Sequence, residues 1–223
     1  DLKDSSSDIA YAGQGGLGLP DRDYYTREDA KSVLLRVRYR AHIARMLALA
    51  GDANAREEAG WVLALETRLA KASLDPVALR DPENSYHMVA TGEADAQTPR
   101  FSWSALFAAA GRSDISRFSL AQPGFFSVVD QALRDVPIAH WQAYLRWHLV
   151  DDAAPYLSKA FVDADFDFRG HTLRGVKTNK PRWKRAIAAT DAGLGEALGQ
   201  AYVAEAMPPH DATLAARCQW WPG

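Results

Sequence analysis

The sequence lacks features that define several large classes of protein. Its 223 residues include one cysteine, Cys218, which excludes an intrachain disulfide. It has no run of about 18 apolar residues, so a membrane-spanning helix is excluded. The formal net charge is only −2, which argues against a general affinity for nucleic acid or for anionic membranes.

Common catalytic and metal-binding motifs are also missing. There is no G-x-S-x-G nucleophile elbow and no G-x-x-x-x-G-K-[ST] phosphate loop. A helical zinc site of the H-E-x-x-H type needs two histidines four residues apart, and no pair has that spacing. The histidines are His42, His87, His140, His148, His171 and His210. We therefore identify no catalytic, metal-binding or cofactor-binding residue, and a metal site built from distant histidines stays open as an alternative.

The segment DADFDF, residues 163–168, begins like a calcium-binding EF-hand loop. The sixth loop position should be glycine but is Phe168, and the twelfth should be glutamate but is Arg174, so we reject a calcium site. Because Phe166 and Phe168 alternate with charged residues, the pattern predicts a half-buried extended segment.

What the sequence does contain is a helical pattern. Hydrophobic residues make up 48% of the chain, which is enough for a substantial core. Apolar residues recur at helical spacing over residues 26–50 and 53–73, which predicts an antiparallel helical hairpin. Trp61, Val62, Leu65 and Leu69 form the apolar stripe of the second helix, and Glu57, Glu58, Glu66 and Lys71 its solvent-facing side.

Further helices are predicted in the second half of the chain. One covers residues 102–112, another ends near Asp135, and a long one starts near Pro137 and is kinked or split at Pro155. A last helix covers residues 181–205. No strand-rich region is evident, so the predicted fold class is mainly α with few or no strands.

A glycine-rich stretch, GQGGLG, fits the dinucleotide-binding pattern G-x-G-x-x-G through Gly13, Gly15 and Gly18. That site also needs a buried strand before the glycines and a helix starting within them. The preceding SSSDIAYA is a poor buried strand, and Pro20 keeps Leu19 extended. We interpret the stretch as a turn whose backbone passes close to other structure.

A basic run lies near residue 180 and surrounds Trp183. Such runs can bind nucleic acid through phosphate contacts and stacking. The acidic overall balance instead favours a loop and a first helical turn with Trp183 in the core, so we expect no nucleic-acid partner. The basic residues are Lys177, Lys180, Arg182, Lys184 and Arg185.

Several stretches, taken in order, resemble the neprilysin and endothelin-converting-enzyme family of zinc metallopeptidases. The similarity covers about Asp8 to Met207 and rests on the number, order and spacing of the stretches. They are GGLGLPDRDYY, RVRYRAHIARMLALAG, ETRLAKASLDPVALRDPENSY, QPGFF, WQAYLRWHLVDDAAPYLSKAFVDADFDFRGHTLRG, PRWKRAI and LGEALGQAYV.

The resemblance implies a mostly helical, two-lobed metalloendopeptidase that encloses a cavity and works outside the cytoplasm, anchored or secreted. Residues 1–207 would correspond to its N-terminal peptidase region, including the non-catalytic lobe that restricts substrates by size. The family's H-E-x-x-H, its downstream Glu ligand and its orienting Asp follow these landmarks, so no catalytic or metal-binding residue carries over. Zinc belongs to the parent enzyme, and we expect none in this chain.

The ends of the chain carry further expectations. The sequence has no initiator Met, and residues 208–223 depart from the family pattern. We expect an inactive fragment, incomplete at both ends, that meets peptide substrates only together with a catalytic lobe. The alternative is an inert helical binding or interaction module. We expect a lobe cut from its partner to expose apolar faces, and the candidates include Trp141, Trp147, Trp183, Trp220 and Trp221.

Overall fold

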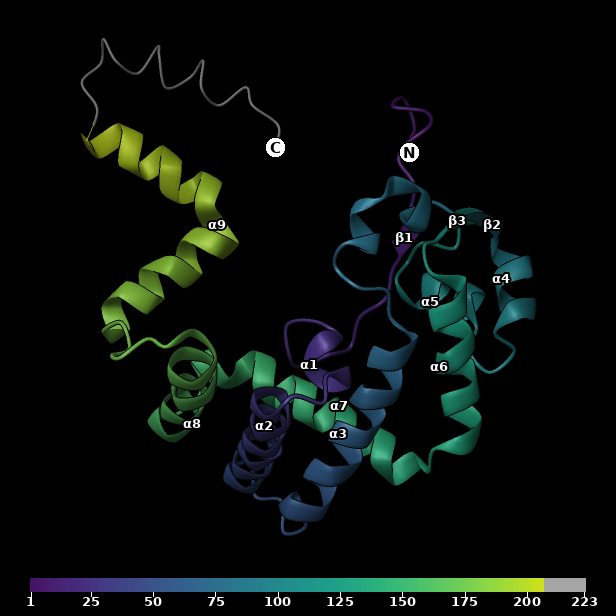
Figure 1. Cartoon of the computed structure of the whole chain (residues 1–223). Helices are drawn as coiled ribbons and strands as arrows, with labels where there is room; N and C mark the ends of the chain where they lie inside the picture. Colours follow the sequence, from purple (N-terminus) through teal and green to yellow (C-terminus); the bar gives the residue numbers. More distant parts are fainter. Residues whose placement is uncertain (207–223) are drawn as a thin grey trace. The chain divides into compact units, whose positions relative to one another are not determined.

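The computed structural model describes residues 1–206, which fall into two compact units (Figure 1). Unit 1 comprises residues 1–173, and unit 2 begins at Arg174. The described residues form nine α-helices and three short strands. This confirms the predicted fold class, mainly α with few strands. Trp220 and Trp221 lie outside the described residues.

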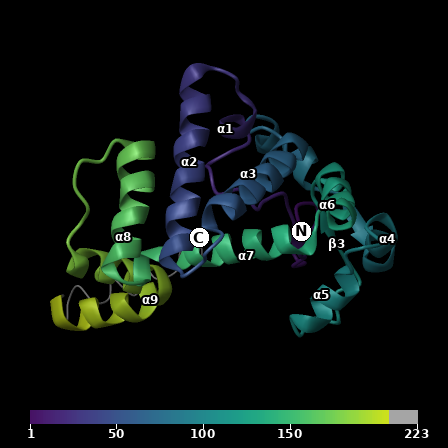
Figure 2. The same ribbon diagram turned by 90° about the horizontal axis from the view of Figure 1, so that it is seen from below.

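The larger part of unit 1 is a body of packed helices (Figure 2). Helices α2 (Ala30–Leu49) and α3 (Ala55–Ala72) pack against each other, and both pack on α7 (Ile138–Ala153). The short α1 (Asp23–Thr26) packs on α2 and α3, and α8 (Lys159–Asp165) packs on α2. Fully buried side chains at the centre of this body include Tyr39, Ile43, Met46, Leu47, Val62 and Trp147.

The predicted hairpin of α2 and α3 is confirmed, with one boundary corrected. Asp29 caps α2 because its side chain accepts hydrogen bonds from the backbone N–H groups of Lys31 and Ser32. The helix therefore starts at Ala30, whereas Thr26 belongs to the preceding α1. Gly51 lies just after the end of α2, at the start of the hairpin turn, with a φ of 89°, a conformation that favours glycine.

A small sheet forms a second core in unit 1. Strand β3 (Arg117–Leu120) lies between β1 (Tyr11–Ala12), which is parallel to it, and β2 (Met88–Ala90), which is antiparallel. The turns η1 (Ala78–Arg80) and η2 (Pro82–Ser85) precede β2, and helices α4 (Thr91–Gln97), α5 (Trp103–Ala109) and α6 (Pro123–Asp135) complete this part. The ring of Phe126 on α6 packs against both cores and so joins them.

The predicted split at Pro155 is confirmed. Helix α7 ends at Ala153, the turn η3 (Ala154–Tyr156) contains the proline, and α8 starts at Lys159. The extended segment predicted from residues 163–168 is wrong, because α8 continues there into a π-helix, η4 (Phe166–Thr172). A Cβ at Gly170 would lie 2.4 Å from Phe166 Cδ2. The absence of a side chain at Gly170 therefore leaves room for the Phe166 ring.

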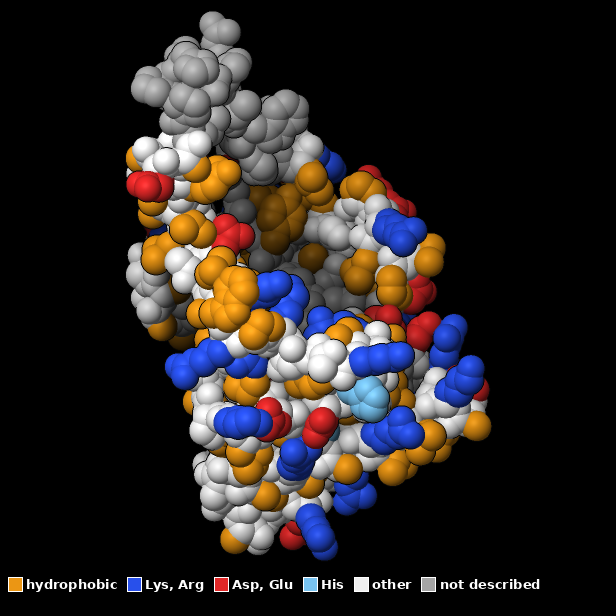
Figure 3. Space-filling model, turned by 90° about the vertical axis from the view of Figure 1, so that its left-hand side faces the viewer, with side chains coloured by type: hydrophobic (Ala, Val, Ile, Leu, Met, Phe, Trp, Pro, Cys, Tyr) orange, Lys and Arg blue, Asp and Glu red, His pale blue; other side chains and the backbone are white. Residues whose placement is uncertain are grey.

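Unit 2 is described up to residue 206 and contains helix α9 (Arg182–Ala206), which confirms the predicted last helix. The helix is interrupted at Leu194, which has non-helical φ and ψ values and stands between two glycines. The predicted core position of Trp183 is wrong, since 60% of this residue is exposed and Lys184 Nζ lies 5.2 Å from its ring. Figure 3 shows hydrophobic side chains exposed on this helix with Lys and Arg side chains near them.

Two of the tryptophans expected on exposed apolar faces have different outcomes. Trp183 is 60% exposed, which confirms the expectation for that residue. Trp147 was expected on an exposed face but is fully buried, so that prediction is wrong. The exposed apolar side chains of α7 are instead Ile138, Leu145 and Leu149. Among residues 1–206, no helix is both long and apolar enough to cross a membrane.

Candidate functional site: a buried polar centre around Glu66

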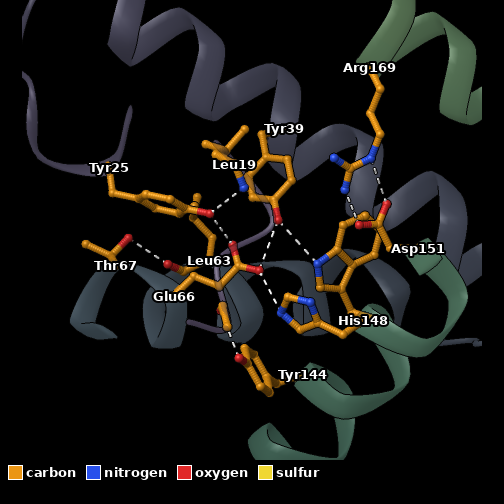
Figure 4. A network of polar contacts seen from close by, with 12 residues as sticks. Leu19, Tyr25, Tyr39, Leu63, Glu66, Thr67, Tyr144, His148, Asp151 and Arg169 are labelled. Carbon is orange, nitrogen blue, oxygen red and sulfur yellow. Dashed lines mark hydrogen bonds and ion pairs between the residues drawn. The ribbon is translucent and has the colours of Figure 1, made fainter. Parts of the chain in front are cut away.

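A carboxylate lies at the centre of unit 1. Glu66 projects from α3 and is completely buried. The hydroxyl of Tyr25 on α1 donates to Glu66 Oε2 over 2.8 Å, and that of Tyr39 on α2 donates to Oε1 over 3.0 Å. From α7, His148 Nε2 lies 3.1 Å from the same Oε1, an ion-pair distance when the imidazole is protonated. These side chains, shown in Figure 4, meet from four helices.

The sequence placed Glu66 and Glu58 on the solvent-facing side of their helix, and the structure shows that both assignments are wrong. Glu66 has no exposed surface and Glu58 only 9%. A carboxylate can be buried when several donors replace its water, and two phenols supply them at Glu66. A buried tyrosine needs a hydrogen-bond partner, so the tyrosines in the sequence indicate that polar partners exist. No sequence pattern identifies Glu66 as such a partner.

Both phenols also accept hydrogen bonds and so extend the centre. The backbone N–H of Leu19 donates to Tyr25 Oη over 2.9 Å, and Trp147 Nε1 donates to Tyr39 Oη over 3.2 Å. Burial, followed by the negative charge of Glu66, raises the pKa of Tyr25 and of Tyr39 well above the ordinary value of 10. The hydroxyls therefore stay protonated at physiological pH and act as donors to the carboxylate.

The glycine-rich stretch packs directly on this centre. A Cβ at Gly18 would lie 1.9 Å from Tyr39 Oη and 3.2 Å from Glu66 Oε1. At Gly16, which has a φ of 77°, the carbonyl accepts a hydrogen bond from Tyr144 Oη over 2.8 Å, and a Cβ would lie 2.2 Å from that oxygen. Close backbone approach, predicted for the stretch, is confirmed at these two positions.

The remaining glycines of the stretch do not share this requirement. A Cβ at Gly15 would have no atom within 4 Å, and one at Gly13 would make an ordinary contact. The next helix begins only at Asp23, so no helix N-terminus forms within the glycines. The geometry that dinucleotide binding requires of G-x-G-x-x-G is therefore not present here.

Gln14 anchors the same stretch to both halves of unit 1. Its side-chain amide forms two hydrogen bonds with the backbone of Leu74, of 3.0 Å to the carbonyl and 2.8 Å from the N–H. Its backbone N–H donates to Gln122 Oε1 over 2.8 Å. Gln122 in turn donates to the carbonyl of Asn84 over 2.9 Å. The stretch thus connects the helical body to the loops around the small sheet.

Two residues of α7, Asp151 and Arg146, form ion pairs that hold the helix to its neighbours. Asp151, only 6% exposed, binds Arg169 of η4, and the guanidinium Nε of Arg169 also lies 3.4 Å from Asp165. Burial raises the pKa of Asp151, and the charge of Arg169 opposes that rise. Arg146 binds Asp52 in the hairpin turn and lies 2.9 Å from Glu58 on α3.

The described histidines lie apart from one another. His42 is buried in the core, His140 stacks on Trp61, and His148 faces Glu66, whereas His87 and His171 are exposed. His210 falls outside the described residues. Within residues 1–206, no group of three or more His, Cys, Asp or Glu side chains could hold a metal ion. These residues do not fit a zinc ion, and we assign no step of zinc chemistry to them.

The polar centre holds structural elements together. Glu66, Tyr39 and Trp147 are fully buried, whereas the side chain of His148 is 23% exposed. The bonds of the centre fix the glycine-rich stretch and helices α1, α2, α3 and α7 relative to one another. We conclude that it positions the helices of this body relative to one another.

Comparison with known proteins shows to which protein family the chain belongs. A model of the N-terminal part of peptidase family M13 matches residues 1–217. The chain belongs to peptidase family M13. It is 28% identical to rat (Rattus norvegicus) endothelin-converting enzyme 1 and 27% identical to the human enzyme, in both cases over 209 residues. The family, and the resemblance found in the sequence, are thereby confirmed.

Solved structures of a zinc metalloprotease share the fold. The open state of zinc metalloprotease Zmp1 from Mycobacterium tuberculosis matches 94% of the chain with a TM-score of 0.82 and 28% identity. Zmp1 in complex with an inhibitor matches 87% with a TM-score of 0.81 and 31% identity. The chain covers 35% and 30% of those two structures, and 27% of each of the two converting enzymes, for which 91% of this chain is matched. It corresponds to the N-terminal region of an M13 metallopeptidase.

Proposed function

We propose that this chain forms the non-catalytic lobe of a zinc metalloendopeptidase and acts together with a catalytic lobe that carries the zinc site. The observation that supports this most is the match of 94% of the chain to Zmp1, of which the chain covers about a third. The described residues provide a packed helical body and no group of three or more side chains that could hold a metal ion. Metal-dependent peptide hydrolysis needs an activated water and a general base, which the other lobe would supply.

The role that we propose for this lobe is to limit the size of substrates. A helical body held by a buried polar network keeps its shape, which a wall around a peptide chamber requires. Peptides would be the substrates, and the enzyme would work outside the cytoplasm, as the family resemblance implies. No catalytic, metal-binding or cofactor-binding residue is proposed within the chain.

The first test is to sequence the DNA that follows codon 223. We expect it to encode H-E-x-x-H within a few hundred codons, in the same or another frame. The second test compares the 223-residue chain with a polypeptide extended through that motif. The extended protein should bind zinc, cleave short quenched-fluorescence peptides in a chelator-sensitive way, and cleave long unfolded proteins far more slowly.

The chain alone serves as the control and should bind no stoichiometric zinc and cleave nothing. One zinc per chain together with chelator-sensitive cleavage by the 223-residue chain would refute the assignment of catalysis to another lobe. Equal rates on short peptides and on long unfolded proteins would refute the size restriction while leaving the peptidase assignment intact. A helical binding module without chemistry would be supported if no H-E-x-x-H follows.

A further inference from the structure

The π-helix η4 occupies a special place in the chain. It is the last regular element of unit 1, which ends at Leu173, and unit 2 begins with Arg174. π-helices are rare and are often found where a helix has a functional role. Contacts with α2, together with the ion pair between Arg169 and Asp151 of α7, hold η4 in this place.

Three contacts hold η4 to α2. The ring of Phe168 stacks on His42, with 4.7 Å between ring centroids and 13° between ring planes. The same ring lies 5.4 Å from the ring of Tyr39. Nearer the surface, Arg45 Nη1 binds Asp167 Oδ2 over 2.7 Å. Two aromatic contacts and one ion pair thus form what we call the α2–η4 clasp.

His42 is the titratable group inside this clasp. It is 5% exposed and packs edge-on against Trp147 of α7, with 5.5 Å between ring centroids. Its Nε2 atom is buried and has no hydrogen-bond partner in the described part of the chain. A proton added to the ring would therefore bring a charge into an apolar place.

The two cations near His42 oppose its protonation as well, whereas the carboxylate of Asp167 favours it. Arg45 comes from its own helix and Arg169 from η4, and each would repel an imidazolium. The carboxylate of Asp167 is bound by Arg45, and those of Asp151 on α7 and Asp165 near the end of α8 by Arg169. Glu66 of α3 accepts the hydroxyls of Tyr25 and Tyr39. Burial, then Arg169 and Arg45, lower the pKa of His42 from 6.5 to about 3.

We propose that the α2–η4 clasp opens in acid, with His42 as its trigger, and that opening frees the segment that leads into unit 2. The direction of the pH effect follows from the linkage between proton binding by His42 and opening of the clasp. When the clasp opens, water reaches His42 and its ordinary pKa of 6.5 returns, so the open state binds the proton that the closed state rejects. The clasp is fully stable above pH 6.5 and loses stability as the pH falls toward 3.

The expected effect can be calculated from these two values. With a pKa of 6.5 in the open state and about 3 in the closed state, the open-to-closed ratio rises about 25-fold between pH 7 and pH 5. This inference is independent of the peptidase role proposed above, because it concerns contacts within unit 1 only.

The test is hydrogen–deuterium exchange of the full 223-residue chain at pH 7 and pH 5, corrected for the intrinsic pH dependence of exchange. Peptides covering residues 162–173 should lose protection by roughly the calculated factor, whereas peptides from α3 should keep theirs. The variants His42→Gln and His42→Phe remove the titration, and the second keeps a stacking ring. In both variants, the protection of residues 162–173 should change with pH no more than the protection of α3 does.

The matched control is His171→Gln, which removes an exposed histidine from the same π-helix. It should keep the wild-type response. Wild-type protection of residues 162–173 that is the same at pH 7 and pH 5 overturns the proposal even if no variant folds. So does a full wild-type response in either folded His42 variant, or the loss of the response in His171→Gln.

Discussion

The substitution Gly18→Ala tests the polar centre most directly. The added methyl group would lie 1.9 Å from Tyr39 Oη and 3.2 Å from Glu66 Oε1, so the tyrosine has to move. Tyr39 is fully buried and its ring contacts Tyr25, Trp147 and Phe168, so it has little room to do so. Gly18 does not have a positive φ, so the effect comes from this contact and not from backbone strain.

The size of the effect follows from two costs. Forcing an extra methyl group into a packed core costs about 1–3 kcal/mol of unfolding free energy. Moving the Tyr39 hydroxyl away from Glu66 removes a hydrogen bond to a charged group, which is about 1.5–3 kcal/mol more. We expect a total loss of about 3–5 kcal/mol, which corresponds to a fall in Tm of roughly 10 °C for a chain of this length.

Gly15→Ala is the matched control. A methyl group there meets no atom within 4 Å, and Gly15 also lacks a positive φ. It should leave stability unchanged or raise it by less than about 1 kcal/mol, because it restricts only the unfolded chain. Urea and thermal unfolding, followed by far-ultraviolet circular dichroism and by tryptophan fluorescence, measure both variants. Equal stability of the two variants would refute the argument that Gly18 is required by Tyr39.

Three further predictions concern side chains. Glu66→Ala leaves two buried phenols without their acceptor and should lower the unfolding free energy, measured in urea, by about 3–5 kcal/mol. Glu66→Gln should cause a smaller loss, and equal losses in the two variants would contradict a role for the charge of Glu66. Asp151→Ala leaves the partly buried Arg169 without its main partner and should cost about 2–3 kcal/mol, whereas Asp114→Ala, in an exposed pair with Arg112, should have no measurable effect. Trp183→Phe should remove tryptophan emission that acrylamide quenches, while Trp147→Phe should remove emission that acrylamide does not reach. The reverse result would show that Trp183 is not exposed.

Helices could be predicted from the sequence because their signals are local. The spacing of apolar residues in α2 and α3, the stop at Gly51 and the break at Pro155 each act within a few residues along the chain. The resemblance to the metallopeptidase family could also be recognised, because it depends on the order of short stretches.

The polar centre could not be predicted because its partners are distant in sequence. The bond between Tyr25 and Glu66 joins residues 41 positions apart, and the contact of His148 with Glu66 comes from yet another helix. Glutamate is usually exposed, so helical spacing alone assigns Glu66 to the solvent side. The π-helix was missed for a related reason, since alternation of Phe and Asp indicates a strand unless Gly170 is known to accommodate the Phe166 ring.

The bonds of the glycine-rich stretch have a consequence for the order in which the protein folds. Its partners lie 60 residues away at Leu74, 108 residues away at Gln122 and 128 residues away at Tyr144. During synthesis this stretch leaves the ribosome early, yet it cannot complete its bonds until α7 has been made. Long-range contacts of this kind slow folding. The hydrogen bond between Tyr144 and the Gly16 carbonyl therefore forms only after α7 has been made.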